Sequence, residues 1–150
     1  MRLTAYTDYT LRTLMYLAIK PDRAATIAEI AGIYAISEAH LTKIVHQLGM
    51  TGEIATTRGR GGGLRLGRPA SSINLGAVVR RTEPDMELVA CFGDAGACAI
   101  GDACVLSGVL KEALDAFLAV LDRYTLADLV DPRVRLATLL RLDPPLQESA

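Results

Sequence analysis

Aromatic side chains, cysteines and long apolar runs are all scarce in this sequence. Aromatics make up 5 % of the 150 residues and tryptophan is absent, whereas 51 % of residues are hydrophobic. The chain can therefore build a folded core, mostly from Leu, Val, Ile and Ala. No apolar run approaches the roughly 20 residues of a membrane-spanning helix. Arg2, Asp8 and Arg12 interrupt the apolar N-terminal region, which argues against a signal peptide. We expect a cytoplasmic protein with no membrane partner.

The usual marks of an enzyme are also missing. The sequence has no paired acid and base set, no nucleophile triad and no Rossmann glycine fingerprint. It contains no internal repeat and no low-complexity segment. We therefore expect a protein that is not an enzyme.

Charge is divided unevenly along the chain. Residues 1–82 contain 11 Lys or Arg and 5 Asp or Glu, whereas residues 83–150 contain 5 and 12, so the net charges are +6 and −7. A basic part suits a polyanion such as nucleic acid, and the acidic part suits a different task. Gradual drift of charge is the alternative, and the sharp division favours two tasks.

Residues 4–50 have the pattern of three helices. The first spans residues 4–20, with Leu11, Leu14, Met15 and Ala18 on its apolar face. “TIAE”, beginning at Thr26, is a capping box that opens a short second helix. Ser37 is the predicted N-cap of a third helix, which buries Leu41, Ile44, Val45 and Leu48. Two short helices joined by a tight turn are typical of a helix-turn-helix.

The segment after the third helix predicts a β-hairpin. “EIATT”, “RGRGGG” and “LRLGRPAS” follow one another as strand, glycine loop and strand. A hairpin at this place is the wing of a winged-helix domain. A phosphate-binding nucleotide loop is excluded because no Lys-Ser/Thr follows and the glycines precede a strand. A plain solvated hairpin is the alternative, and the preceding helix pair favours a wing that binds DNA.

The expected DNA contacts come from the third helix and from the wing. The N-terminal part of a recognition helix meets base edges in the major groove, and arginines on a narrow hairpin suit the minor groove or its phosphates. The candidate residues are Ser37, Glu38, His40, Thr42, Lys43, Arg58, Arg60, Gly62, Arg65 and Arg68.

The rest of the chain is predicted to be mainly helical. A short helix over 73–82 stops before Pro84, and the longest helix covers 105–123. Its apolar seam (Leu106, Leu110, Ala113, Phe117 and Val120/Leu121) suits another helix, in the same chain or in a partner. A short helical turn precedes a last helix over 132–142. The fold class is therefore mainly α with a small β-hairpin wing, a winged helix-turn-helix domain plus a long dimerisation helix. We divide the chain into a DNA-binding domain (1–82), a cysteine loop (83–104), a dimerisation and C-terminal helical part packing on the first helix (105–142) and a tail (143–150).

All three cysteines lie within one glycine-rich stretch, “CFGDAGACAIGDAC”. The gaps of six and five residues between Cys91, Cys98 and Cys104 do not suit a zinc knuckle, which usually has tight cysteine pairs. A redox disulfide would leave one thiol over, and such a loop is a poor place for three unrelated buried cysteines. Three thiolates around an iron–sulfur cluster with one position open to substitution fit better.

Six features together resemble the nitric-oxide-sensing branch of the Rrf-two family of winged-helix regulators. They cover about residues 1–131 and are the three cysteines with “LTAYTDYTLRTLMYLA”, “ISEAHLTKIVHQL”, “RGRGGGLRLGRPAS”, “VVRRTEP” and “YTLADLV”. The resemblance implies a homodimer, operator DNA as partner, a long helix that crosses to the other subunit, and an iron–sulfur cluster on the cysteines. One departure is the first cysteine gap of six residues, where relatives usually have five.

The fourth ligand separates the branches of this family. A branch with a [2Fe-2S] cluster uses a histidine three residues after the last cysteine, where this chain has Ser107. The nitric-oxide-sensing branch with a [4Fe-4S] cluster uses an aspartate of the first helix, donated by the other subunit, and Asp8 is its match here. The resemblance therefore favours [4Fe-4S], with [2Fe-2S] as the alternative. The alternative role of Asp8 is an i,i+4 ion pair with Arg12 on an exposed helix face. Both roles can hold together, since Arg12 would orient or screen the carboxylate.

The function expected from this resemblance is a nitric-oxide-responsive transcriptional repressor. Nitrosylation of its cluster would relieve repression of nitric-oxide detoxification genes. An iron- or redox-status sensor is the first alternative and an electron-transfer iron–sulfur protein the second. A winged-helix regulator with vestigial cysteines is a further one.

Overall fold

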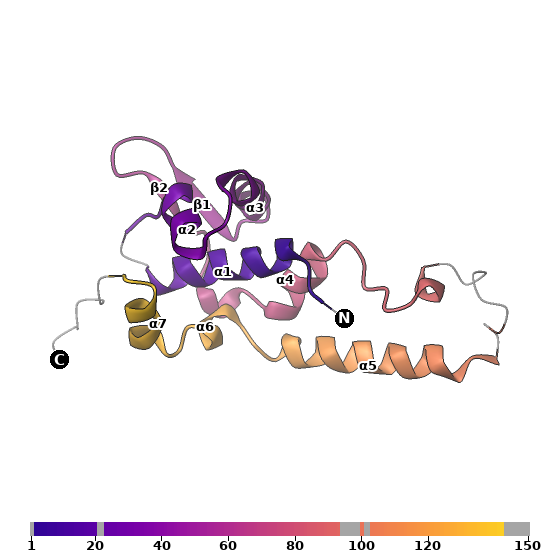
Figure 1. Cartoon of the computed structure of the whole chain (residues 1–150). Helices are drawn as coiled ribbons and strands as arrows, with labels where there is room; N and C mark the ends of the chain where they lie inside the picture. Colours follow the sequence, from indigo (N-terminus) through magenta and orange to yellow (C-terminus); the bar gives the residue numbers. More distant parts are fainter. Residues whose placement is uncertain (1, 21–22, 94–99, 101–102, 143–150) are drawn as a thin grey trace.

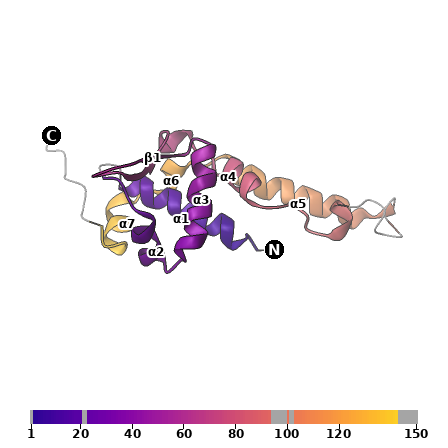
Figure 2. The ribbon, with the colours of Figure 1, turned by 90° about the horizontal axis from the view of Figure 1, so that it is seen from above.

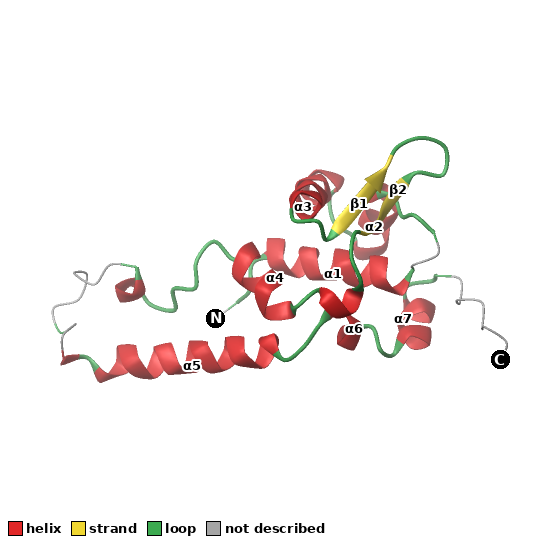
Figure 3. Ribbon diagram, turned by 180° about the vertical axis from the view of Figure 1, so that it is seen from behind, coloured by secondary structure: helices red, strands yellow, loops and turns green. Residues whose placement is uncertain are grey.

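The computed structural model describes residues 2–20, 23–93, 100 and 103–142, and it is mainly helical with one small hairpin (Figure 1). The helix-turn-helix and the wing lie on one side of the first helix, and the C-terminal helices lie on the other (Figures 1 and 3). The elements are α1 (Ala5–Ile19), α2 (Ile27–Tyr34), α3 (Glu38–Met50), β1 (Ile54–Thr57), β2 (Gly63–Leu66), η1 (Ala70–Ser72), α4 (Leu75–Thr82), η2 (Ala90–Phe92), α5 (Val105–Asp122), α6 (Leu126–Leu129) and α7 (Arg133–Leu139).

Helix α1 is the central element, packed by α3, β2, α4, α6 and α7. It begins at the N-cap Thr4, whose hydroxyl accepts a hydrogen bond from the Thr7 amide. Leu14 and Ala18 are buried as predicted, whereas Leu11 and Met15 are only half-buried. Tyr16 and three threonines are buried as well. The single apolar face expected from the sequence is therefore too narrow, because α1 is covered from several directions.

The helix-turn-helix forms as predicted. Thr26 and Glu29 make the capping box of α2, and the Ser37 hydroxyl accepts from the His40 amide at the start of α3. The four predicted core residues of α3 are all buried. Ala35, between the helices, adopts a left-handed conformation that forms the tight turn (φ 53°).

The wing is a two-stranded antiparallel hairpin. Its register pairs Ile54 with Leu66 and Thr57 with Gly63. Its tip needs glycine for close packing, because a Cβ on Gly62 would lie 2.2 Å from the carbonyl oxygen of Thr57. A β-bridge between Ala25 and Leu64 attaches the hairpin to the segment before α2, with N···O distances of 2.9 and 2.7 Å.

Helix α5 projects from the body as a long arm, joined to it at its C-terminal end (Figures 1 and 2). At that end, Asn74 caps α4 and donates to the carbonyls of Asp122 and Tyr124. Arg80 of α4 binds Asp122 through two hydrogen bonds of 2.6 and 2.7 Å. These contacts fix the direction in which the arm leaves the body.

The apolar side chains of α5 form two stripes rather than the single predicted seam. One stripe is half-buried and comprises Leu110, Leu114, Phe117, Leu118 and Leu121. Leu114 and Phe117 border a cavity together with residues of 83–88. A second stripe is exposed: Leu106 is 61 % exposed, Val109 54 % and Val120 45 %, and Ala113 and Ala116 lie between them. Its spacings of three and four residues are those of a coiled-coil seam.

The C-terminal part differs from expectation in one respect. Pro132 precedes α7 as predicted, but the helix ends at Leu139 rather than at residue 142, and Arg141 has a φ of 54°. The predicted tail at 143–150 lies outside the described residues.

Candidate DNA-binding surface and cysteine site

The polar face of α3 is open to solvent. Glu38, His40, Thr42 and Lys43 are all exposed, and Ser37 stands at the start of the helix. The Thr42 hydroxyl donates to the carbonyl of Glu38 at 2.8 Å, so its lone pairs remain for an outside donor. The structure thus brings the predicted recognition residues together on one accessible helix face.

The wing carries the predicted arginines on the same side of the molecule as α3 (Figure 1). Arg58, Arg60, Arg65 and Arg68 are exposed, and Gly62 lies between them at the tip. Arg58 and Arg60 flank the turn, and Arg68 stands two residues beyond β2 at the root of the hairpin. A helix face and a basic hairpin side by side match the two grooves of a duplex.

The root of the wing contains a buried carboxylate that sequence reasoning missed. The Glu53 side chain is 0 % exposed and forms ion pairs with Arg68 at 2.9 Å and with Arg81 at 2.6 Å. Arg68 is therefore held by an intramolecular partner as well as facing solvent. Two features of the sequence could have indicated this ion pair. Glu53 directly precedes a strand rich in β-branched residues, and α4 carries two consecutive arginines, Arg80 and Arg81.

A surface groove runs along the contact between the N-terminal half of α1 and α3. It has a volume of about 250 Å³ and is lined by Tyr6, Tyr9, His40 and Lys43 with Ala5 and Ile44. The rings of Tyr9 and His40 lie with centroids 6.3 Å apart. The N-terminal turns of α1 are thus in contact with the recognition helix.

Two of the three cysteines fall within the described residues. Cys91 lies in the short turn η2 and Cys104 immediately precedes α5, and both are half-buried free thiols. Cys98 lies outside the described residues. Within the described part of the chain, no group of three or more His, Cys, Asp or Glu side chains is placed to hold a metal ion.

Asp8 is on the body of the molecule, in the first turn of α1. Its Oδ1 accepts from Nε of Arg12 at 2.9 Å, and both side chains are 45 % exposed, as the i,i+4 spacing predicted. The Arg12 guanidinium also lies 5.9 Å from the ring centroid of Tyr34 in α2. Burial raises the pKa of Tyr34, with Arg12 acting in the opposite direction.

Cys91 and Cys104 are not brought together with Asp8 of the same chain. Helix α1 lies in the body, whereas η2 and the start of α5 lie at the outer end of the arm in every view (Figures 1–3). Residues 83–89 span the distance between them. In this arrangement, a site that combined Cys91 and Cys104 with an Asp8 carboxylate would need the Asp8 of a second chain.

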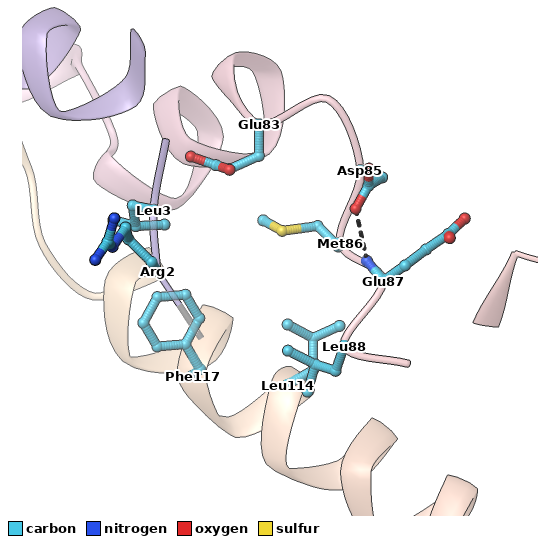
Figure 4. Close-up of a pocket in the computed structure, with 9 residues that line it drawn as sticks. All are labelled: Arg2, Leu3, Glu83, Asp85, Met86, Glu87, Leu88, Leu114 and Phe117. Carbon is cyan, nitrogen blue, oxygen red and sulfur yellow. Dashed lines mark hydrogen bonds between the residues drawn. The ribbon is translucent and has the colours of Figure 1, made fainter. Parts of the chain in front are cut away.

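A cavity of about 210 Å³ lies where the cysteine segment leaves the body (Figure 4). Leu3, Met86 and Phe117 contribute apolar side chains to it, and Glu83 and Asp85 lie at its edge. Burial acts to raise the pKa of Glu83, but hydrogen bonds from Thr7 and Thr4 outweigh it and hold the pKa below its usual range. Glu83 thereby fastens the end of α4 to the start of α1.

No helix in the described part of the chain is long and apolar enough to cross a membrane.

Comparison with known proteins agrees with these features. A family model described as “Rrf2: Iron-dependent Transcriptional regulator” matches residues 3–132. The HTH-type transcriptional regulator NsrR of Halalkalibacterium halodurans is 49 % identical over 146 residues, which cover 96 % of this chain and 100 % of that protein. The regulator of the same name from Bacillus subtilis is 49 % identical over 144 residues, covering 95 % of this chain and 99 % of that one.

Solved structures show the same fold. IscR of T. potens has a TM-score of 0.73 at 21 % identity, over 91 % of this chain and 90 % of that chain. CymR, described as the global cysteine regulator of B. subtilis, has a TM-score of 0.70 at 24 % identity, over 88 % and 98 %. The predicted fold class is confirmed. The relatives are named transcriptional regulators, which confirms that the chain is not an enzyme, and the chain belongs to the Rrf2 family of transcriptional regulators.

Proposed function

We propose that this regulator is a nitric-oxide-responsive repressor whose homodimer binds operator DNA under the control of an iron–sulfur cluster. The relatives at 49 % identity that share the name NsrR support this specific role. By the resemblance noted above, the regulated genes serve nitric-oxide detoxification. The observation that carries the proposal is the separation of Cys91 and Cys104 from Asp8 within one chain, combined with an exposed apolar stripe on α5.

The DNA-binding part in this proposal is residues 1–82. Helix α3 enters the major groove with Glu38, His40, Thr42 and Lys43 at its exposed N-terminal half, and Ser37 lies at its N-cap. The wing reaches the neighbouring minor groove or its phosphates with Arg58, Arg60 and Arg65 around Gly62. Arg68, shared with Glu53, contributes at the root. Residues 83–104 form the cluster-binding segment and 105–142 the dimerisation part.

A second copy of the chain is the proposed partner of the exposed stripe on α5. Leu106, Val109, Ala113, Ala116 and Val120 follow alternating spacings of three and four, so two such helices can pack along this seam. Pairing of the arms carries the cysteine segment of each chain toward the body of the other. Asp8 of the partner subunit can then complete a site that one chain leaves incomplete.

The donor set fits an iron–sulfur cluster. Cys91 and Cys104 are free and half-buried rather than packed in the core, and Cys98 lies between them in sequence. Cys104 precedes the N-terminus of the 18-residue helix α5, where the helix dipole favours negative charge. Three thiolates and one carboxylate suit [4Fe-4S], with [2Fe-2S] as the alternative. Such a cluster supplies an iron whose oxygen ligand is more easily replaced by nitric oxide than a thiolate.

In this proposal the chain contributes to switching through Asp8, whose carboxylate binds either the cluster of the other subunit or Arg12 of its own helix. Oδ1 of Asp8 accepts from Nε of Arg12 at 2.9 Å, so Arg12 would hold the carboxylate whenever it is not a ligand. Arg12 in turn lies over Tyr34 of α2, and the neighbouring Tyr9 contacts His40 of α3. The ligand position is thus adjacent to both helices of the helix-turn-helix.

Anaerobic native mass spectrometry tests the proposal directly. The wild-type protein should appear as a dimer carrying iron and sulfide, and Asp8→Ala should lose the cluster faster on exposure to nitric oxide. Asp115→Ala is the matched control, because Asp115 also forms an exposed i,i+4 ion pair, with Lys111. A protein that binds no iron and sulfide, or a monomer, contradicts the proposal.

DNA-binding assays with different small molecules identify the signal to which the regulator responds. Nitric oxide should weaken binding of the cluster-loaded dimer to operator duplex, whereas peroxide or an iron chelator at equal exposure should act less. A stronger response to peroxide or chelation favours the redox or iron sensor. Absence of salt-dependent, sequence-specific duplex binding favours an electron-transfer protein. A colourless protein that binds DNA regardless has vestigial cysteines.

A further inference from the structure

The wing has a buried ionic contact at its root, formed by Glu53, Arg68 and Arg81, which we call the wing clamp. Glu53 lies between α3 and β1, Arg68 lies beyond β2, and Arg81 lies in the last turn of α4. The clamp therefore joins both ends of the hairpin to α4.

Every oxygen of the Glu53 carboxylate is hydrogen-bonded. Nη2 of Arg81 lies 2.6 Å from both Oε1 and Oε2. Nη2 of Arg68 lies 2.9 Å from Oε1, and the Thr51 hydroxyl donates to Oε2 at 2.8 Å. A carboxylate that is 0 % exposed needs such partners, since an unpaired buried charge is strongly unfavourable. The position of Glu53 is thus tightly determined.

The main chain of Glu53 is part of the same junction. Its N–H donates to the carbonyl of Leu48 at 2.9 Å, and its carbonyl accepts from Gly67 at 2.8 Å. One residue therefore connects the recognition helix, both strands and α4.

The hairpin is too small to hold its own direction. Each strand has four residues, and three of the four β1 residues are exposed. A two-stranded hairpin of this size is marginal in water unless other elements support it. The bridge at Ala25 and the buried side chains of Ile54 and Leu64 anchor the strands, and the clamp adds an ionic contact from the root of the wing to α4.

We propose that Glu53 and Arg81 are positioning residues for DNA recognition, which hold the wing at the angle where Arg58 and Arg60 reach the duplex while α3 occupies the major groove. This inference rests on the proposed function, because it needs the wing to contact DNA. It also gives Arg68 a role within the protein in addition to its place in the basic surface.

A double-mutant cycle tests the clamp. Arg81→Lys keeps the charge, but the lysine side chain is one atom shorter, so its ammonium falls short of the position of Nη2, which binds both carboxylate oxygens. Glu53→Gln removes the charge with little change in shape. Each is combined with Arg60→Ala at the wing tip, and affinity is measured on a duplex enriched from a random library by wild-type protein. Arg80→Lys is the matched control, since it makes the same substitution one residue away at a contact with α5.

In wild type and in Arg80→Lys, the Arg60→Ala change should weaken binding about tenfold. In Arg81→Lys and Glu53→Gln, the same change should weaken it less than about threefold, because the misplaced wing already contributes little. Equal effects of Arg60→Ala in all backgrounds, with circular dichroism showing folded protein, overturn the inference.

Hydrogen exchange gives a second readout that needs no DNA. Amides of residues 54–66 should exchange faster in Arg81→Lys than in Arg80→Lys, while those of α3 stay protected. Unchanged exchange in the wing contradicts the clamp even where Glu53→Gln fails to fold. If no duplex is enriched by wild-type protein, the proposed DNA-binding function fails, which is a separate outcome.

Discussion

Replacing Val109 by glutamate should dissociate the proposed dimer. Val109 lies in the exposed stripe on α5, between Leu106 and Ala113, and it is 54 % exposed in the single chain. Full burial of a valine side chain is worth about 1.5–3 kcal/mol, so burying the exposed half contributes roughly 1 kcal/mol per subunit.

The symmetry of a dimer doubles this contribution. Each subunit presents the same residue, so Val109→Glu removes about 2 kcal/mol in total and also places two carboxylates in one apolar seam. A loss of that size corresponds to about a 30-fold rise in the dimer dissociation constant. Glutamate has good helix propensity, so the fold of α5 itself should not suffer.

Sedimentation velocity over a dilution series measures the dissociation constant. Ala119→Glu is the control, because Ala119 is also exposed on α5 but lies off the stripe, on its polar side. The control should remain dimeric, and Val109→Glu should dissociate at concentrations where wild type does not. If both variants dimerise like wild type, this stripe is not the seam and the two-chain cluster site loses its basis.

Three further predictions concern single contacts. Gly76→Ala should lower the melting temperature, because its Cβ would lie 1.9 Å from Oδ1 of Asp122. Gly108→Ala, where nothing lies within 4 Å of the new Cβ, should raise the melting temperature by improving helix propensity. The opposite order of melting temperatures would be inconsistent with the described α4–α5 junction. Burial acts to raise the pKa of Glu29, but hydrogen bonds from Lys20 and Tyr16 outweigh it and lower the pKa from 4.5 to about 2. Stability from this group is therefore present above about pH 4.5 and is lost as the pH falls toward 2, by roughly 2 kcal/mol, and urea unfolding of Glu29→Gln should show a flatter loss over this range. Arg60→Ala should reduce the slope of log affinity against log salt by about 1 if Arg60 binds a phosphate, and an unchanged slope would argue against that contact.

Local signals in the sequence were sufficient for most elements. The caps at Thr26 and Ser37 and the buried positions of α3 were predicted residue by residue, because capping and 3.6-residue periodicity depend on neighbours in the chain. The hairpin was also visible from its glycine-rich loop, although β2 begins at Gly63 and ends at Leu66, short of the predicted strand segment “LRLGRPAS”.

Long-range contacts were less accessible. The wing clamp joins residues 28 positions apart, Glu53 and Arg81, and nothing in the local pattern distinguishes that glutamate from an exposed one. The two stripes of α5 were merged into one seam, because periodicity identifies apolar positions but not what covers them. For the same reason, the sequence assigned too narrow a face to α1, which is enclosed by five elements.

The C-terminal turn of α4 explains how a segment without regular structure can matter to DNA binding. Arg80 binds α5, Arg81 binds the root of the wing, Thr82 accepts from a threonine of α1, and Glu83 accepts from the residue that caps α1. Four consecutive side chains thus hold three different parts of the molecule. Pro84 and the cysteine segment follow immediately, so a displacement that starts at the cysteines and passes along residues 84–90 reaches this turn first. Because each contact is short and directional, such a displacement would act on the arm, the wing and the first helix together rather than on any one of them alone.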